Sequence, residues 1–354
     1  MTVVTDNQIV SLHTASGVQW LDFTPENYTS CSWGRKQRDA SSCDLVLPPG
    51  DDAVALYERI AQWRDWLSVY DGDVGTLLWS GPIQQTRRGR RGLSINAKDH
   101  GAYLLRTRNP ITRRWDGADP SAVAGRLWEA MVEAQGLTSR VIINPDPEGD
   151  RYDFQVLTDE QMLDQTIRDL VNLGLKWTVV SNTAIIGPLG LEPIATLSED
   201  DFQGDGLEFI RDGSQTFNDV LVRGPDNLAR ATVDYYGQNL QTIANVDSMF
   251  GVSNVSKAAQ QYVGHTGKVR TRLELAAGTE LSPDAPVSIE ELMPATRFVI
   301  EGDGVRQLFE LTAVDVDRSS RGASVKVTME SVEEDIELLD TKDQPVMTLG
   351  GQTL

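Results

Sequence analysis

Cysteine and histidine are scarce in this sequence, which has only two cysteines and three histidines in 354 residues. Two cysteines are too few for a disulfide-stapled scaffold or for a zinc site of the usual kind. Cys31 and Cys43 flank a predicted hairpin and could face each other across strands. Because the chain is expected to be made in a reducing cytoplasm, we predict free thiols, with a disulfide as the alternative.

Catalytic motifs are also missing. The sequence has no GxSxG, HExxH, GxxxxGK[ST] or GxGxxG pattern. His13, His100 and His265 are isolated in the sequence, and we expect each to be a surface or half-buried polar residue rather than a ligand or base. Carboxylate pairs such as Glu290–Glu291 occur, but nothing in the sequence places two of them across a cleft. We therefore predict a protein that is not an enzyme and binds no cofactor.

Long apolar runs are absent too. None approaches the ~20 residues that a membrane helix needs, so we expect no stable membrane insertion. The first residues, MTVVTDNQIVSLHTASG, lack the basic start and apolar core of a signal peptide. The sequence therefore predicts synthesis and assembly in a cytoplasm.

Positive charge is outnumbered, since 32 Lys and Arg stand against 52 Asp and Glu, a formal net charge of −20. Such a balance argues against a protein that coats DNA or an anionic membrane. Within it, four arginines crowd around two glycines in TRRGRRG, between two predicted strands: Arg87, Arg88, Arg90 and Arg91.

Two interpretations of these arginines remain open. They can be a solvated hairpin loop that keeps a sheet edge soluble. They can also contact an acidic partner surface or a nucleic acid, because the guanidinium fork suits carboxylate and phosphate. No aromatic residues interleave with them, as they would in a platform for single-stranded nucleic acid, so we favour an acidic protein partner over nucleic acid.

An acidic stretch, NPDPEGDRYDFQ, partly matches a calcium loop. Its candidate ligands occupy loop positions 1, 3, 5 and 7, and they are Asn144, Asp146, Glu148 and Asp150. The twelfth position is Gln155, where a bidentate Glu is expected, and the two prolines are atypical. A solvated acidic turn is therefore the favoured interpretation over a metal site.

The first third of the chain is predicted to be mostly strands, with β-branched, aromatic and alternating residues between Gly, Pro, Asn and Asp signals. The exception is 53–63, where apolar residues recur at helical spacing after PPGDD. The predicted strands are 18–23, 29–35, 42–48, a hairpin of WLSVYDG with GTLLWSGPIQQT, and GLSINAKD.

The middle of the chain is predicted to be an α+β module. One helix covers 119–136, with Asp119 as N-cap, Pro120 in the first turn and Gly136 as the stop. Val123, Leu127 and Met131 give this helix its apolar face.

A second helix is predicted near 158–173, started by a capping box of Thr158 and Gln161. The hairpin 175–187 follows and turns at Ser181–Asn182.

From about residue 200 strands return. NDVLVRG is expected to pair with ARATVDYY across PDN, and a short helix is expected at 253–263. QLFELTAVDVD and ASVKVTMES form a hairpin across RSSRG. The last residues, DTKDQPVMTLGGQTL, are expected to be a loose tail or a segment that orders on a partner. The overall prediction is an α+β, predominantly β fold.

One long pattern resembles a known family. It comprises WLDF, CSWGRKQRDASSCDLVLP, WRDWLSVYDG, LLWSGPI, LSINAKDHGAYLLRTR, NDVLVRG, SIEELMPATRFVIEGDG and FELTAVDVDRSSRGASVKVTMES, over most of residues 18–335. This resembles the minor tail proteins of long-tailed phages of actinobacteria that form the tail-tip hub. That family is similar to the baseplate hub of contractile-tailed phages.

The resemblance implies a homotrimeric ring with two barrel-like β-domains per chain, which joins a sixfold tail tube to a threefold tip or fibre. The first barrel would be 1–108, the α+β module 109–199, and the second barrel 200–335 with a helical insertion near 253–263. Residues 336–354 would be a C-terminal tail. The implied partners are further copies of the chain, the tail tube or distal tail ring, the tape measure protein and other minor tail proteins or fibres.

In such a hub the channel passes the tape measure and the DNA, which is not bound specifically. The high acidity suggests that acidic residues line the channel and repel DNA. The expected location is the virion tail tip, after assembly in the host cytoplasm. The alternatives are a receptor- or carbohydrate-binding tail module and a tail-associated enzyme that degrades the cell wall. Most of the eight tryptophans stand in apolar patterns and are expected in the core, not in a glycan-binding face.

Overall fold

A computed structural model provides the structure of the chain. It describes 3–146, 151–190, 192–204, 206–214, 216–223, 227–235, 237–245, 252–267, 269–302, 305–332 and 347–348. Strands make up 48% of it and helices 18%, so the predicted α+β, predominantly β class is confirmed. Within the described ranges, none of the helices is long and apolar enough to span a bilayer.

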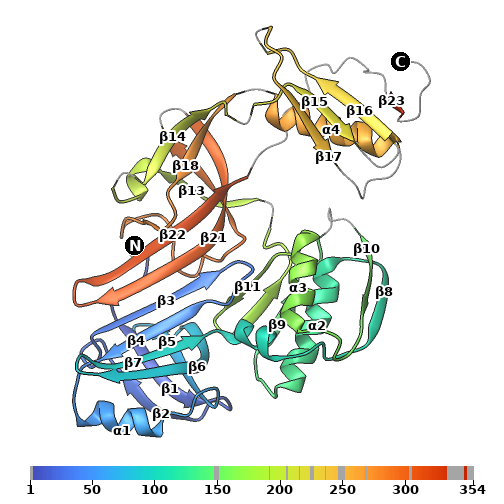
Figure 1. The fold of residues 1–354 in the computed structure, drawn as a ribbon. Helices are drawn as coiled ribbons and strands as arrows, with labels where there is room; N and C mark the ends of the chain where they lie inside the picture. The colour runs from blue at the N-terminus through green and yellow to red at the C-terminus, as the bar shows by residue number, and fades with distance from the viewer. Residues whose placement is uncertain are drawn as a thin grey trace. The chain divides into compact units, whose positions relative to one another are not determined.

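A twelve-stranded sheet dominates the fold (Figure 1). Its main path runs β13-β20-β21-β3-β4-β7-β6-β5-β1-β2; off this path, β22 pairs with β21 and β19 pairs with β22. The strands are β1 Gln8–Thr14, β2 Gln19–Phe23, β3 Ser30–Lys36, β4 Ser42–Leu47, β5 Asp65–Asp71, β6 Leu77–Gly89, β7 Gly92–Lys98, β13 Pro193–Ser198, β19 Thr279–Glu280, β20 Arg297–Gly302, β21 Val305–Ser319 and β22 Gly322–Ser331.

The predicted strands and hairpins of the first third are present. β5 and β6 form the expected antiparallel hairpin, and β7 returns along β6. The helix expected at 53–63 is α1, Asp51–Arg59, which buries Ala53 and Leu56 and carries two aspartates in its first turn. Carboxylates there complement the positive end of the helix dipole.

The first and last parts of the chain share one sheet, because β3 pairs with β21 from Cys31↔Arg318 to Lys36↔Ala313. Two separate barrels were expected. In the described residues the ladder runs from β13 to β2, and no closed barrel is detected. The chain divides into two compact units. The large unit comprises 1–207 and 275–331, and the second unit comprises 208–274 and 332–354.

Arg35 on β3 is hydrogen-bonded to the C-terminal part of the large unit. Its guanidinium is buried and donates through Nη1 to the carbonyls of Ile289 (2.6 Å) and Leu292 (3.1 Å), and through Nη2 to Leu78 O (3.3 Å). Burial lowers the pKa of Arg35 to about 10, against an opposing effect of Glu290, so the group stays charged at neutral pH. One charged side chain thus satisfies carbonyls from segments more than 200 residues apart.

The middle of the chain forms the predicted α+β module. Its helices are α2, Pro120–Ala134, and α3, Leu163–Asn172. They pack on a three-stranded sheet of β11 Trp177–Val180, β12 Thr183–Ile186 and β9 Arg140–Ile143. A ribbon of β8 Arg113–Ala118 with β10 Tyr152–Val156 and the 3-10 helix η1, His100–Arg106, complete the module region.

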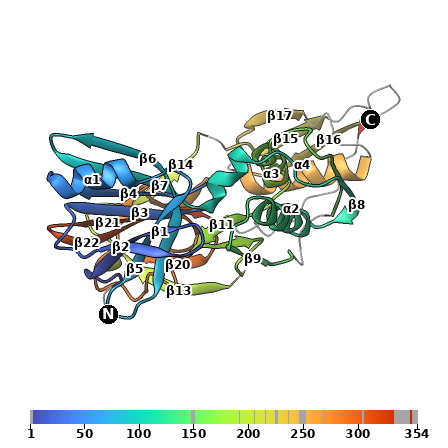
Figure 2. The same ribbon diagram turned by 90° about the horizontal axis from the view of Figure 1, so that it is seen from below.

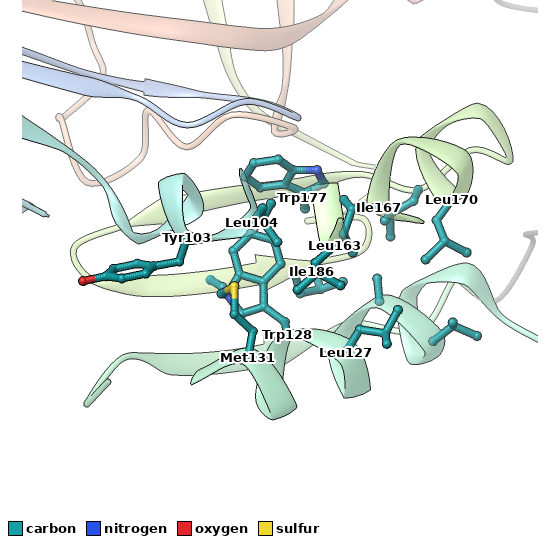
Figure 3. Close-up of a cluster of buried hydrophobic side chains, with 14 of the residues drawn as sticks. Tyr103, Leu104, Leu127, Trp128, Met131, Leu163, Ile167, Leu170, Trp177 and Ile186 are labelled. Carbon is teal, nitrogen blue, oxygen red and sulfur yellow. The ribbon is translucent and has the colours of Figure 1, made fainter. Parts of the chain in front are cut away.

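The N-cap, the first-turn proline and the terminating glycine predicted for α2 are all confirmed. The Asp119 side chain accepts the Ser121 N–H, Pro120 stands in the first turn, and Gly136 has φ +62° after the last turn. The apolar residues at steps of four are fully buried beside Trp128, which packs 5.0 Å from Trp177 between ring centroids (Figure 3). Burial of each such side chain contributes about 1.5–3 kcal/mol.

The predicted start of the second helix is wrong. α3 begins at Leu163, with Met162 as an N-cap that makes no side-chain bond. Gln161 instead donates to Thr166 Oγ1 at 2.7 Å, and Thr158 bonds the Thr112 hydroxyl at 2.9 Å. Thr158 is therefore used in a tertiary contact and Gln161 in a bond to the first turn of α3, neither of which the capping pattern reveals.

The predicted hairpin turn at Ser181–Asn182 is present, with φ of 48° and 62°. These are the left-handed values that a two-residue turn between twisted strands needs.

The module is fastened to the large sheet by polar contacts. Thr178 Oγ1 donates to Lys36 O at 2.9 Å, and the Ser181 hydroxyl donates to Leu77 O at 2.6 Å. Lys176 forms an ion pair with the buried carboxylate of Glu310 on β21, which also accepts from Gln37 Nε2 at 2.8 Å.

The second unit is a small α/β sandwich. β15 Asp219–Arg223 pairs antiparallel with β16 Asn227–Thr232, as predicted, and lies parallel to β17 Gln241–Asn245. Helix α4, Val252–Thr266, covers the predicted 253–263 and packs on β15 and β16 through an alanine- and valine-rich core. β14 Leu207–Asp212 and β18 Arg270–Leu275 pair where the chain enters and leaves this unit.

Most of the predicted tail 336–354 lies outside the described residues. β23, Met347–Thr348, pairs with the start of β16.

Cys31 and Cys43 are buried free thiols, as predicted, with their Sγ atoms 3.9 Å apart. Burial raises the pKa of the Cys43 thiol, which keeps it protonated.

His100 departs from the expectation, because it is fully buried rather than at or near the surface. Its ring lies edge-on to Trp128, and neither ring nitrogen has a hydrogen-bond partner within the described ranges. Burial lowers the pKa of His100 to about 4. The nearby Asn182 side chain opposes this shift, although its geometry with the imidazole is not that of a hydrogen bond.

This burial predicts an acid sensitivity that His100→Met should reduce. The pKa is lower in the folded than in the unfolded state, so the unfolded state binds more protons and stability is lost as pH falls from about 6.5 towards 4. Between pH 7 and pH 4 the variant should gain about 3 kcal/mol of unfolding free energy relative to the wild type. Urea unfolding at both pH values measures this. Buried Asp99, whose pKa burial raises to about 6, acts oppositely but is present in both proteins. If the difference in unfolding free energy between the two proteins is the same at pH 7 and pH 4, this explanation is wrong.

Candidate functional site

The four arginines of the TRRGRRG stretch lie at the exposed tip of the β6–β7 hairpin. Figure 2 shows this hairpin next to α1. Arg87 pairs with Ser94 and Arg88 with Leu93, and Arg90 and Arg91 form the two-residue turn. Gly92 closes the turn with φ +122°, and a Cβ there would meet Leu47 O at 1.9 Å. The sequence therefore folds this stretch as the predicted hairpin.

The arginine side chains are not committed to internal ion pairs. None of the four forms a salt bridge with any residue in the described ranges. Arg88 lies over the Tyr57 ring of α1, 5.6 Å from its centroid. Arg87, Arg90 and Arg91 thus present guanidinium groups to solvent, where a carboxylate-rich surface could bind them.

A polar sheet face extends from this hairpin across six strands. One row runs Gln85, Asn96, Asp44, Ser32, Asp317 and Ser324, from β6 through β7, β4, β3 and β21 to β22. The residues between them in sequence point to the other face and are buried, among them Leu45, Ile95 and Val316. This alternation is typical of a sheet with one face in the core and one outside.

The charges on this polar sheet face are of mixed sign. Asn96 donates to Asp44 at 2.9 Å, and Lys326 lies 3.6 Å from Asp317. Asp315 lies over the backbone of Gly34, where a Cβ would be 2.7 Å from its carboxylate. The face therefore does not by itself supply the purely acidic wall suggested by the net charge.

The candidate calcium loop is only half described, since Glu148 and Asp150 lie outside the described residues. Asn144 uses its amide to donate to Pro188 O at 3.2 Å, and the Asp146 N–H donates to Asp119 at 2.8 Å. In the ranges that the structure describes, no cluster of three or more His, Cys, Asp or Glu could hold a metal.

The remaining expectations concern tryptophan and histidine. Five tryptophans are buried as predicted: Trp33, Trp66, Trp79, Trp128 and Trp177. His13 is half-buried, as predicted, and burial lowers its pKa. The side chain of His265 lies outside the described residues.

Comparison with solved structures identifies the fold. The chain is similar to the 43 kDa tail protein of prophage MuSo2 from Shewanella oneidensis, with TM-score 0.62 and 14% identity over 91% of this chain and 97% of that one. It is similar to the tail protein from Neisseria meningitidis MC58, with TM-score 0.60 and 15% identity over 93% and 98%. A third is prophage tail protein gp18 from Listeria monocytogenes EGD-e, with TM-score 0.51 and 11% identity over 92% and 94%.

No family model matches the sequence, and no curated protein does. At these identities the likeness demonstrates the fold alone. The chain therefore has the fold of phage tail proteins along nearly its whole length, the second unit included.

Proposed function

We propose that this chain is a structural, non-enzymatic component of a phage tail tip, the hub between the tail tube and the tip or fibre. The observation that carries the proposal is the end-to-end structural likeness to prophage tail proteins, each covered over more than nine-tenths of its length. The resemblance of the sequence to tail-tip hub proteins of phages of actinobacteria supports it.

In this proposal the chain forms a homotrimeric ring around a channel. The large sheet offers two outer strands for contacts between copies, β2 at one end and β13 at the other. An exposed apolar side chain lies at each of these edges: Val18, 63% exposed, immediately precedes β2, and Ile194, 44% exposed, lies in β13. Unpaired strand edges are natural places for association, and unlike edges that meet head to tail can close a ring.

The strands of 1–108 and 200–335 would build the ring, with the 109–199 module beside them. The channel would pass the tape measure protein and DNA without specific binding. Further proposed partners are the distal tail ring and other minor tail proteins or fibres, at the tip of a virion tail assembled in the host cytoplasm. The basic hairpin tip would dock on an acidic neighbour.

Electron microscopy of assembled tails that carry an affinity label on this chain tests the main proposal. Label at the distal end of the tail is the expected result, and label along the tube or only on free protein would refute it.

A further inference from the structure

The polar sheet face lies open on six neighbouring strands, β22, β21, β3, β4, β7 and β6 (Figure 1). A shallow hollow of about 220 Å³ lies on it, lined by Asp44, Gln85, Arg87, Ser94 and Asn96. These side chains all belong to β4, β6 and β7. In the described part of the chain, the hollow is thus lined by side chains of the sheet itself.

The opposite face of the same strands is covered within the large unit. Trp33 on β3 donates through Nε1 to Gln8 Oε1 on β1 at 2.9 Å, and Arg35 on β3 donates to Ile289 O at 2.6 Å. Strand β1 and the segment around Ile289 therefore lie on that side of β3. In a ring, the bulk of each chain must lie outside and an open surface must line the hole. The polar sheet face is the side of these strands that meets this requirement.

The polar sheet face is formally neutral, although the chain has a net charge of −20. On either side of the row from Gln85 to Ser324 lies a further row in register, one through Arg87 and Ser94, the other through Lys98 and Asp315. In these three rows three cations stand against three anions: Arg87, Lys98, Lys326, Asp44, Asp315 and Asp317. DNA binding is driven by cations that replace counterions on the phosphates, so a balanced face neither holds nor repels DNA.

The side chains that anchor protein partners are missing from these three rows, all of which the structure describes. The core of a protein interface is enriched in aromatic residues and methionine. None of these residues occurs in the rows, and Val46 is their one aliphatic side chain. Their middle is built from small residues, among them Ser32, Ser42 and Gly34. The face therefore suits a polymer that passes along it better than a protein that docks on it.

We propose that the polar sheet face is the wall of the hub channel and that double-stranded DNA passes along it without being bound. This inference rests on the proposed hub and adds which surface of the chain faces the channel. It differs from the acidic wall that the net charge of the whole chain suggests. Hydroxyl groups and balanced charge make the wall polar without making it attractive or repulsive to phosphate.

The extent of the face fits this role. Six strands about 4.8 Å apart give about 29 Å of wall per copy, and three copies give a circumference of about 86 Å. The backbone diameter is then about 27 Å with upright strands, and larger when the strands tilt as they do in barrels. A DNA duplex has room to pass through such a channel beside short serine side chains.

A cysteine on the polar sheet face tests the assignment in assembled particles. Ser32→Cys is supplied to a phage that lacks the gene, and intact particles are treated with a bulky maleimide–polyethylene glycol. This reagent should modify the purified chain but not intact particles, whose channel is closed. After DNA release, the small reagent N-ethylmaleimide should modify Ser32→Cys, because the channel is then open. Cys31 and Cys43 are buried and should not react, which the wild type verifies.

The control is Ala134→Cys, at an exposed position of α2, which both reagents should modify in every sample. Modification of Ser32→Cys by the bulky reagent in intact particles would mean that the face lies outside the ring. Protection from both reagents after DNA release would mean that another protein covers it. Either result overturns the assignment.

A change of charge tests the passage of DNA. Ser32→Lys with Ser324→Lys adds two positive charges per chain to the wall, and because lysine–phosphate contacts release counterions, DNA entry into host cells should slow at least about tenfold. Ser32→Asn with Ser324→Asn keeps the wall neutral and should leave the rate unchanged. Quantification of phage DNA inside cells after adsorption measures this, with tails counted by electron microscopy. Wild-type entry with the lysine pair would refute the proposal.

These experiments separate the wall from the hub itself. If purified tails lack the chain, the hub proposal fails and the wall assignment fails with it. If the chain is present at the tail tip but the bulky reagent modifies Ser32→Cys there, the hub stands and only the wall assignment is wrong.

Discussion

Reversing the charge of the hairpin tip, in Arg90→Glu with Arg91→Glu, should reduce the yield of infectious particles at least about hundredfold. In the proposed hub these arginines dock on an acidic neighbour, and like charges brought together at an interface cost several kcal/mol, where each 1.4 kcal/mol is tenfold in binding. Both side chains are exposed and form no ion pair within the described ranges, so the melting temperature should stay within a few degrees of the wild type.

The measurement is plaque titre after complementation of a phage that lacks the gene, with tails counted by electron microscopy. Arg90→Lys with Arg91→Lys keeps the charge and should support near-normal titres. Arg140→Glu, at an exposed arginine of β9, controls for a general effect of added acidity. Normal titres with the double Glu variant would mean that the hairpin is only a solubilising loop.

Replacing Arg35 by Met should lower the unfolding free energy by about 4 kcal/mol, a loss well above that of most single substitutions. Methionine keeps an unbranched apolar stem but is shorter and donates no hydrogen bond, so the carbonyls of Leu78, Ile289 and Leu292 lose a charged donor while they remain buried. Because two of these carbonyls lie in the C-terminal part, hydrogen exchange should rise first around 285–296.

Chemical denaturation followed by hydrogen exchange measures both effects. Arg321→Met, at the exposed turn between β21 and β22, is the control and should change stability by no more than about 0.5 kcal/mol. If Arg35→Met changes the unfolding free energy by no more than this control does, the guanidinium does not hold the C-terminal part in place.

Local structure was readable from the sequence where the signals are local. The N-cap at Asp119, the turn at Ser181–Asn182 and the hairpin at the TRRGRRG stretch all formed as predicted, because each needs only neighbouring residues. The capping box at Thr158 failed because Thr158 bonds Thr112, which is distant in sequence, and Gln161 bonds Thr166 inside α3 instead of the N-cap backbone.

Long-range features were not readable. Nothing local to β3 predicts that Arg35 is buried under carbonyls more than 200 residues away, or that β3 pairs with β21. The buried row of Ser11, Ser68 and Ser80 was missed as well, since these residues come from three strands and become one row only through register. The buried Trp66 was expected, but that its N–H has no partner among the described residues depends on the whole environment of the side chain.

Electron microscopy of the purified protein, with class averages examined for symmetry, tests the central claim most directly. The hub predicts a threefold ring with a central hole, built from three copies of the chain in head-to-tail contact. A tail-tube extract added to the sample should supply any partner that the ring needs to close. Compact monomers in both preparations would contradict the hub.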